Sequence, residues 1–168
     1  AGKTKDSTHT YNSDGALTAN GYTLTGWTFI GWATSKNGKV VYNDGATVTN
    51  LTSAANDKFT LYAVWQANTY KVTYDGNKPD GAIGGTVTGA TTETTHIYDV
   101  ASSPANNGFA LTGWTFVGWS RTKGATTAEF KPGENGILNL ATEGSVMLYA
   151  VWQANTYTVK FNKNNANA

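Results

Sequence analysis

The sequence predicts a mostly β protein with little helix, built as two tandem small β-rich repeat units. Three observations carry this prediction. The block Gly21–Trp32 returns almost unchanged as Gly108–Trp119, an offset of 87 residues in a chain of 168. Aromatic and β-branched residues dominate both blocks, and these residue types favour strands over helices. Asn-Gly turn pairs open both blocks. The duplication indicates two units rather than one larger domain.

The repeated block is predicted to form a strand that is apolar on both faces. In an extended chain Trp27 and Phe29 lie on one face, and Ile30 and Trp32 lie on the other. A strand of this kind is expected to be buried on both sides. Gly31 interrupts the alternation, so we expect a β-bulge or a close backbone approach there and at its counterpart in the second block.

The aromatic residues of the repeated segments are the predicted core. Large aromatic side chains bury wide areas and dominate the energetics of small cores. A second interpretation is a sugar-binding platform, because an exposed tryptophan face can stack on a pyranose ring. That interpretation requires a tryptophan left in solvent. The predicted core aromatics are Trp27, Phe29, Trp32, Trp65, Trp114, Phe116, Trp119 and Trp152.

Further strands are predicted in each repeat. Leu61–Tyr70 is identical to Leu148–Tyr157, and its first five residues are apolar on both faces, which indicates a central strand. Tyr70–Tyr74 then alternates apolar and polar residues, as does its counterpart Tyr157–Phe161, so each is expected to be a half-buried strand. A short strand is also expected at Thr8–Tyr11.

A linker and two candidate helical turns complete the predicted layout. Residues 75–89 are rich in turn residues and are expected to link a first unit, residues 1–76, to a second unit, residues 77–168. The modest candidates for a helical turn are residues 49–58 and 138–145. Neither shows a sustained 3.6-residue pattern.

The composition excludes several classes of function. Net charge is +1, with 12 basic and 11 acidic residues spread along the chain, so there is no basic stripe for nucleic acid. The chain has no cysteine, which rules out disulfides and thiolate chemistry. No apolar run approaches the length of a transmembrane helix, and no signal peptide is visible. We therefore expect no nucleic-acid partner and no membrane insertion.

No catalytic site, no metal site and no cofactor is predicted. Each repeat has one histidine, His9 and His96, without a second ligand nearby in sequence, so both are interpreted as hydrogen-bonded strand residues. Asp6 and Glu93 form the only acidic position kept by the offset, and one carboxylate is not an acid–base pair. An enzyme is therefore not expected.

The order of the motifs resembles the Listeria–Bacteroides repeat family, which comprises the B-type repeats of internalin-like bacterial surface proteins. The resemblance rests on Gly21–Trp32, Leu61–Trp65 and Tyr70–Tyr74 with their second copies. It implies a small β-grasp-like unit that occurs in tandem arrays on secreted or cell-surface proteins. It also implies spacer or adhesive roles without catalysis.

The phase of the repeat predicts how units join. Residue 1 aligns with Thr88, after the Tyr70–Tyr74 strand, whereas the second copy of that strand is near the C-terminal end. If each strand belongs to the unit that follows it, the first unit lacks one and the last copy has no unit. That copy would then be donated to a neighbouring subunit by strand addition. The alternatives are a strand that pairs with the unit before it and a segment cut from a longer array. The predicted assembly residues are Tyr157, Val159 and Phe161.

Two functions are compatible with these patterns. The first is an extracellular structural repeat protein, a stalk or pilus-like filament subunit that joins identical subunits head-to-tail by C-terminal strand exchange. The second is a cell-surface adhesin module that binds a glycan or a host protein through exposed aromatics. Both place the protein outside a bacterial cell.

Overall fold

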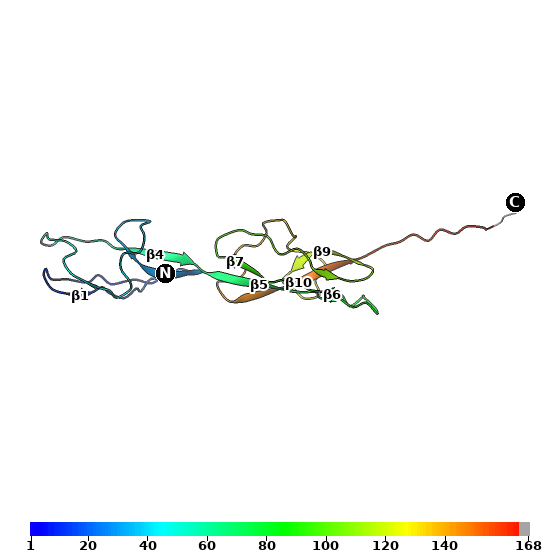
Figure 1. The fold of residues 1–168 in the computed structure, drawn as a ribbon, viewed down its shortest axis with the longest axis horizontal. Helices are drawn as coiled ribbons and strands as arrows, with labels where there is room; N and C mark the ends of the chain where they lie inside the picture. Colours follow the sequence, from blue (N-terminus) through cyan, green and yellow to red (C-terminus); the bar gives the residue numbers. More distant parts are fainter. Residues whose placement is uncertain (165–168) are drawn as a thin grey trace. The chain divides into compact units, whose positions relative to one another are not determined.

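A computed structural model describes residues 1–164 (Figure 1). Within those residues it contains ten strands and no helix, which confirms the predicted mostly β class. The last four residues of the predicted second unit, 165–168, lie outside the described part. The strands are β1 Gly15–Ala16, β2 Trp27–Ala33, β3 Thr47–Val48, β4 Tyr62–Ala67, β5 Thr69–Asp75, β6 Thr88–Gly89, β7 Thr94–Ile97, β8 Phe109–Ala110, β9 Trp114–Ser120 and β10 Ser145–Ala154.

The strands form one four-stranded sheet and three two-stranded sheets. The larger sheet has the order β7-β5-β10-β9, and the small sheets pair β1 with β3, β2 with β4 and β6 with β8. The antiparallel pairs β2–β4 and β9–β10 are copies of each other at the offset of 87. They differ because β5 and β7 extend only the second pair. The β-grasp-like unit that the resemblance implies includes a helix, whereas residues 1–164 contain none.

The glycine in the middle of the repeated block is a β-bulge, as the sequence predicts. The register of β2 against β4 shifts between Phe29 and Gly31, and Gly31 has a φ of 142°. A Cβ at Gly31 would lie 2.7 Å from the carbonyl oxygen of Tyr42, so a larger residue does not fit without movement of the backbone. The bulge corrects one prediction, because it brings Phe29 and Trp32 together, with ring centroids 4.9 Å apart, and leaves Ile30 exposed rather than buried.

Neither of the candidate helical turns forms. Residues 49–58 and 138–145 run through bends, turns and irregular backbone up to β10. Asn50 and Asn56 in the first segment, and Asn139 in the second, have positive φ values of 54°, 61° and 51°. A left-handed residue interrupts a right-handed helix, and asparagine tolerates that conformation better than most residues. These asparagines therefore specify loops.

The structural offset between the repeats is not constant. Gly15 pairs with Val48, and Ser102 pairs with Ile137. The first partners are offset by 87 residues, from 15 to 102, and the second partners by 89, from 48 to 137. The segment between these partners is therefore longer in the second repeat. Equivalent residues of the two repeats have to be identified from their backbone pairing, because a fixed offset of 87 does not hold throughout.

The chain forms two compact units that interleave in sequence. One comprises residues 1–71, 95–101 and 138–145, and the other comprises residues 72–94, 102–137 and those from 146 onwards. These units differ from the predicted ranges 1–76 and 77–168. Two segments of the second repeat, residues 95–101 and 138–145, belong to the first compact unit, so a repeat in sequence is not a closed unit in space.

Each compact unit has its own core. The buried cluster of the first unit consists of Leu17, Trp32 and Val48. The most buried side chains of the second unit include those of Trp119, Ile137, Leu148 and Val151. A tryptophan of the repeated block is therefore central in both.

Candidate assembly site

Strand β5 lies between β7 and β10 in the sheet of the second repeat (Figure 1). Its residues, Thr69–Asp75, follow directly after β4 of the first repeat. The backbone N–H of Lys71 donates to the carbonyl oxygen of Gly144 at 2.8 Å. The Thr73 hydroxyl donates to the carbonyl oxygen of Val146 at 3.4 Å. A strand that follows one repeat in sequence thus completes the sheet of the next.

Aromatic side chains anchor β5 along its length. The ring of Tyr70 stacks on the imidazole of His96 with centroids 5.5 Å apart, and both side chains are buried. The ring of Tyr74 packs on Trp119 with centroids 4.6 Å apart. Val72, between the two tyrosines, has no exposed surface. These contacts confirm the strand that the alternation of Tyr70–Tyr74 predicts.

The Tyr74 hydroxyl connects β5 to two other segments of the second repeat. It lies 2.8 Å from the Thr94 hydroxyl oxygen, and it accepts the backbone N–H of Ala105 at 2.8 Å. The carbonyl oxygen of Ala105 in turn accepts the indole N–H of Trp119 at 3.0 Å. β5 therefore helps to position Ala105, whose carbonyl oxygen accepts the buried indole N–H of Trp119.

Among the described residues, the first repeat has no strand in the place of β5. Its sheet is the pair β2–β4, and β4 has 6 residues where β10 has 10. The predicted short strand Thr8–Tyr11 is absent, although its counterpart in the second repeat overlaps β7. The physical reason is pairing, because β7 forms against β5 and a segment without a neighbour gains no ladder hydrogen bonds. We call residues 7–10 and 58–61, the counterparts of β7 and of the first four residues of β10, the open edge.

The open edge exposes groups whose counterparts are covered. His9 is exposed, whereas only 4% of His96 is exposed. Phe59, just before β4, is 42% exposed. Trp32 is buried, but its indole N–H has no hydrogen-bond partner among the described residues, unlike that of Trp119. A buried donor without a partner is costly, so the first repeat is less complete than the second.

The second copy of the β5 segment is in solvent. The side chains of Tyr157, Val159 and Phe161 are 89%, 60% and 94% exposed, and residues 155–164 form no strand. The half-buried strand expected at Tyr157–Phe161 is therefore absent, because no neighbouring strand among the described residues lies beside this segment to pair with it. These three side chains repeat the alternation of Tyr70, Val72 and Tyr74. Burial of such a side chain contributes roughly 1.5–3 kcal/mol. Burial of these three side chains in another sheet would therefore stabilise the protein further. The predicted assembly residues are therefore accessible.

The predicted core aromatics are all at least partly covered. Each of the six tryptophans is buried or half-buried. Phe29 lies 4.9 Å from Trp32 and 5.6 Å from Trp65 between ring centroids. The buried members of the set are Trp32, Trp119 and Trp152, and the half-buried members are Trp27, Phe29, Trp65, Trp114 and Phe116.

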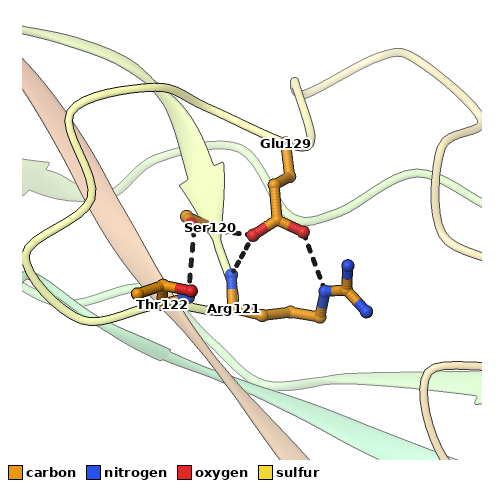
Figure 2. Close-up of polar contacts among 4 residues, drawn as sticks. All are labelled: Ser120, Arg121, Thr122 and Glu129. Atoms are coloured by element: carbon orange, nitrogen blue, oxygen red, sulfur yellow. Dashed lines mark hydrogen bonds and ion pairs between the residues drawn. The ribbon is translucent and has the colours of Figure 1, made fainter.

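A polar cluster closes the hairpin that follows β9 (Figure 2). The Glu129 carboxylate accepts the Ser120 hydroxyl at 2.8 Å, the backbone N–H of Arg121 at 3.0 Å and the Arg121 guanidinium at 2.8 Å. The Ser120 hydroxyl and Arg121 hold the pKa of Glu129 below its ordinary value. The cluster joins Ser120 and Arg121, at the end of β9, to Glu129 across the hairpin. The described residues also contain no group of three side chains suited to a metal ion.

A contact at the end of the first repeat has no signal in the sequence pattern. The indole N–H of Trp27 donates to the carboxylate of Asp99 at 2.9 Å. The carbonyl oxygen of Asn68 accepts the backbone N–H of Tyr98 at 2.9 Å. All four residues belong to the first compact unit. We call these four residues the junction, because they join the end of one repeat to a loop of the next.

Part of the predicted linker, residues 75–89, is packed. The indole N–H of Trp152 donates to the carbonyl oxygen of Gly76 at 2.8 Å. The amide nitrogen of Asn77 donates to the carbonyl oxygen of Ala150 at 2.8 Å, and Asn77 is buried. The segment after β5 therefore adds to the core of the second compact unit.

Comparison with known proteins identifies relatives but no established family. No protein-family model and no solved structure matches the chain. A protein of Evansella cellulosilytica with the provisional name Gly-rich membrane protein is 34% identical over 142 residues, which is 83% of this chain and 15% of the relative. Another from the same organism, provisionally named membrane protein, is 30% identical over 105 residues, 62% of this chain and 14% of the relative. The chain therefore spans a small part of the relatives that it matches. In residues 1–164, no helix has the length and apolar character needed to cross a bilayer.

Proposed function

We propose that this chain is an extracellular structural repeat protein, a stalk or pilus-like filament subunit. Its repeats join head-to-tail, and the joining element is the strand that follows each repeat. The observation that carries the proposal is the position of β5, which follows the first repeat in sequence and lies inside the sheet of the second. Tyr157–Phe161 stands in the same relation to the second repeat.

The open edge and the exposed segment are complementary in chemistry. Residues 7–10 and 58–61 of the open edge form no strand, and the ring of Phe59 among them is exposed. The same repeat holds the buried indole N–H of Trp32 without a partner among the described residues. The exposed segment presents Val159 and Phe161 in the alternation that β5 uses in the second repeat. In strand addition, backbone hydrogen bonds supply affinity and alternate side chains supply specificity. Insertion of Tyr157–Phe161 into the open edge of a second molecule would supply both the backbone hydrogen bonds and the alternate side chains.

The geometry of this exchange favours linear arrays. A head-to-tail contact joins two different surfaces, so it builds a fibre when its rotation does not close. Within a longer polypeptide the same strand would fill the repeat that comes next in the chain, which also extends a line. The resemblance to the Listeria–Bacteroides repeats and the provisional names of the relatives support a location at the bacterial surface.

The proposal is tested on the full chain by electron microscopy and analytical ultracentrifugation over a range of protein concentrations. We expect linear polymers that lengthen with concentration. Val159→Asp places a charge on the buried face of the donated strand and should leave monomers. Thr158→Lys is the matched control, because its counterpart Lys71 is an exposed lysine in β5. Polymers that persist unchanged with Val159→Asp would refute strand exchange.

A second candidate function is the adhesin module. It is supported by a surface hollow of about 280 Å³ in the first repeat, whose lining includes Tyr62 and Trp65. A glycan array probed with the full chain tests it, with Tyr62→Ser as the variant that removes the more exposed ring. Binding that disappears in a folded Tyr62→Ser protein supports the adhesin. An array without binding removes the glycan form of this candidate.

A further inference from the structure

We propose that the residue at the position of Asn12 and Asp99 sets how tightly one repeat holds the next. This inference rests on the proposed head-to-tail assembly. In the internal junction the position is an aspartate that accepts the indole N–H of Trp27. At the open edge of the first repeat, which receives the strand of another repeat in the proposed assembly, it is an asparagine, whose outward atom is a donor. The joint formed at Asn12 is therefore weaker than the joint formed at Asp99.

The aspartate is held in a reciprocal pair that leaves one oxygen free for the tryptophan. The backbone N–H of Asp99 donates to the side-chain oxygen of Asn139 at 2.6 Å. The side-chain amide of Asn139 donates back to Oδ1 of Asp99 at 2.6 Å. Oδ2 of Asp99 then accepts Nε1 of Trp27 at 2.9 Å. The left-handed backbone of Asp99, with a φ of 59°, sets this geometry.

Asn12 repeats the pair in the first repeat. Its φ is 60°, its backbone N–H donates to the side-chain oxygen of Asn50 at 2.6 Å, and Asn50 donates back to Oδ1 of Asn12 at 2.9 Å. The orientation of both amides follows from this network, because a backbone N–H requires an oxygen and the other atom of Asn50 is then a donor. Nδ2 of Asn12 therefore occupies the place where Asp99 has its free oxygen.

The end of the second repeat carries the same partner as the internal junction. Trp114 is the counterpart of Trp27. Asn155 accepts the Thr115 hydroxyl at 2.6 Å, as Asn68 accepts the Thr28 hydroxyl at 2.6 Å. The backbone N–H of Asn155 donates to the carbonyl oxygen of Gly113 at 2.9 Å, and Asn68 makes the same bond to Gly26 at 2.9 Å. A second molecule joined in this way would bring Nε1 of Trp114 to Nδ2 of Asn12, which are two donors.

Two facing donors form no hydrogen bond, whereas the carboxylate of the internal junction accepts one with the help of its charge. A hydrogen bond to a charged group corresponds to about tenfold in an equilibrium constant, or more. The position thus separates a strong joint, between the two repeats of this chain, from a weaker joint at the open edge of the first repeat. Asn12→Asp would remove the difference in strength between the two joints.

Self-association of Asn12→Asp tests this inference between molecules. We expect the association constant measured by sedimentation to rise about tenfold over that of the unaltered chain. Ser13→Asp adds the same charge one residue away and should not produce this rise. An Asn12→Asp protein that associates no better than Ser13→Asp would overturn the inference.

Asp99→Asn tests the same rule inside one molecule, in the Val159→Asp background. We expect hydrogen exchange of the Trp27 indole N–H, followed by nuclear magnetic resonance, to accelerate about tenfold. Asn12→Asp in that background should leave the exchange rate unchanged. An unchanged rate in Asp99→Asn overturns the inference whatever the polymers do. Chains that fail to associate in every variant overturn the proposed assembly instead, and the exchange rate still decides the role of Asp99.

Discussion

Tyr74 packs on Trp119 with ring centroids 4.6 Å apart, and the two residues come from different repeats of the sequence. Tyr74 belongs to the strand that follows the first repeat, and Trp119 belongs to the repeated block of the second. Trp32, the counterpart of Trp119, has Tyr22 and Phe29 as ring neighbours from its own repeat. The second core is therefore completed by a residue that the first core lacks.

Replacement of the two equivalent tryptophans should have unequal effects. Trp119→Ala removes a side chain without exposed surface and should lower the free energy of unfolding by about 3–5 kcal/mol. Trp32→Ala should cost less, because it also removes an indole N–H that is buried without a partner. Urea denaturation measures both. A loss for Trp32→Ala that equals or exceeds the loss for Trp119→Ala would contradict this view of the first core.

Removal of a single hydroxyl tests how β5 is held. Tyr74→Phe keeps the ring on Trp119 but leaves the backbone N–H of Ala105 without its acceptor. The free energy of unfolding should fall by about 1 kcal/mol or more. Tyr157→Phe is the control, since its side chain is exposed and its loss of a hydroxyl should be neutral in the monomer. Equal stability of both variants would show that the Tyr74 hydroxyl contributes nothing.

Local patterns in the sequence predict the fold class and several elements correctly. Aromatic and β-branched alternation places β5 and the strands that contain Trp32 and Trp119, because side-chain period and propensity are properties of the segment itself. The bulge at Gly31 is also predictable, since a glycine inside a strand pattern marks a position without room for a Cβ.

The relations between segments are not predictable in the same way. The alternation of apolar and polar residues does not show which other strand a segment pairs with. It therefore leaves open which of the two repeats β5 completes. The contact of Trp27 with Asp99 joins residues 72 apart without any shared motif. The missing strand at Thr8–Tyr11 is a consequence of that partner choice, because the same sequence pattern forms β7 only where β5 is beside it.

The buried histidine predicts a pH dependence. Burial lowers the pKa of His96 below its ordinary value, which is about 6.5. Below about pH 6.5 the unfolded chain takes up a proton on this imidazole more readily than the folded chain does. The contribution of the neutral, buried His96 to the free energy of unfolding is therefore fully present above that pH and is lost as the pH falls. Unfolding curves at a series of pH values should show this loss, and His96→Gln should reduce it. His9→Gln, at the exposed counterpart, should retain it. An unchanged slope in His96→Gln would contradict the prediction.

Hydrogen exchange at the open edge is the most direct measure of strand donation. The Val159→Asp protein, which keeps its own strand from inserting, is mixed with an excess of a peptide of residues 155–164. We expect slower amide exchange at residues 7–10 and 58–61, because backbone hydrogen bonds form on both sides of the peptide. The same peptide carrying Val159→Asp should have no effect. Unchanged exchange at residues 7–10 and 58–61 in the presence of the native peptide would contradict the claim that this strand completes the first repeat.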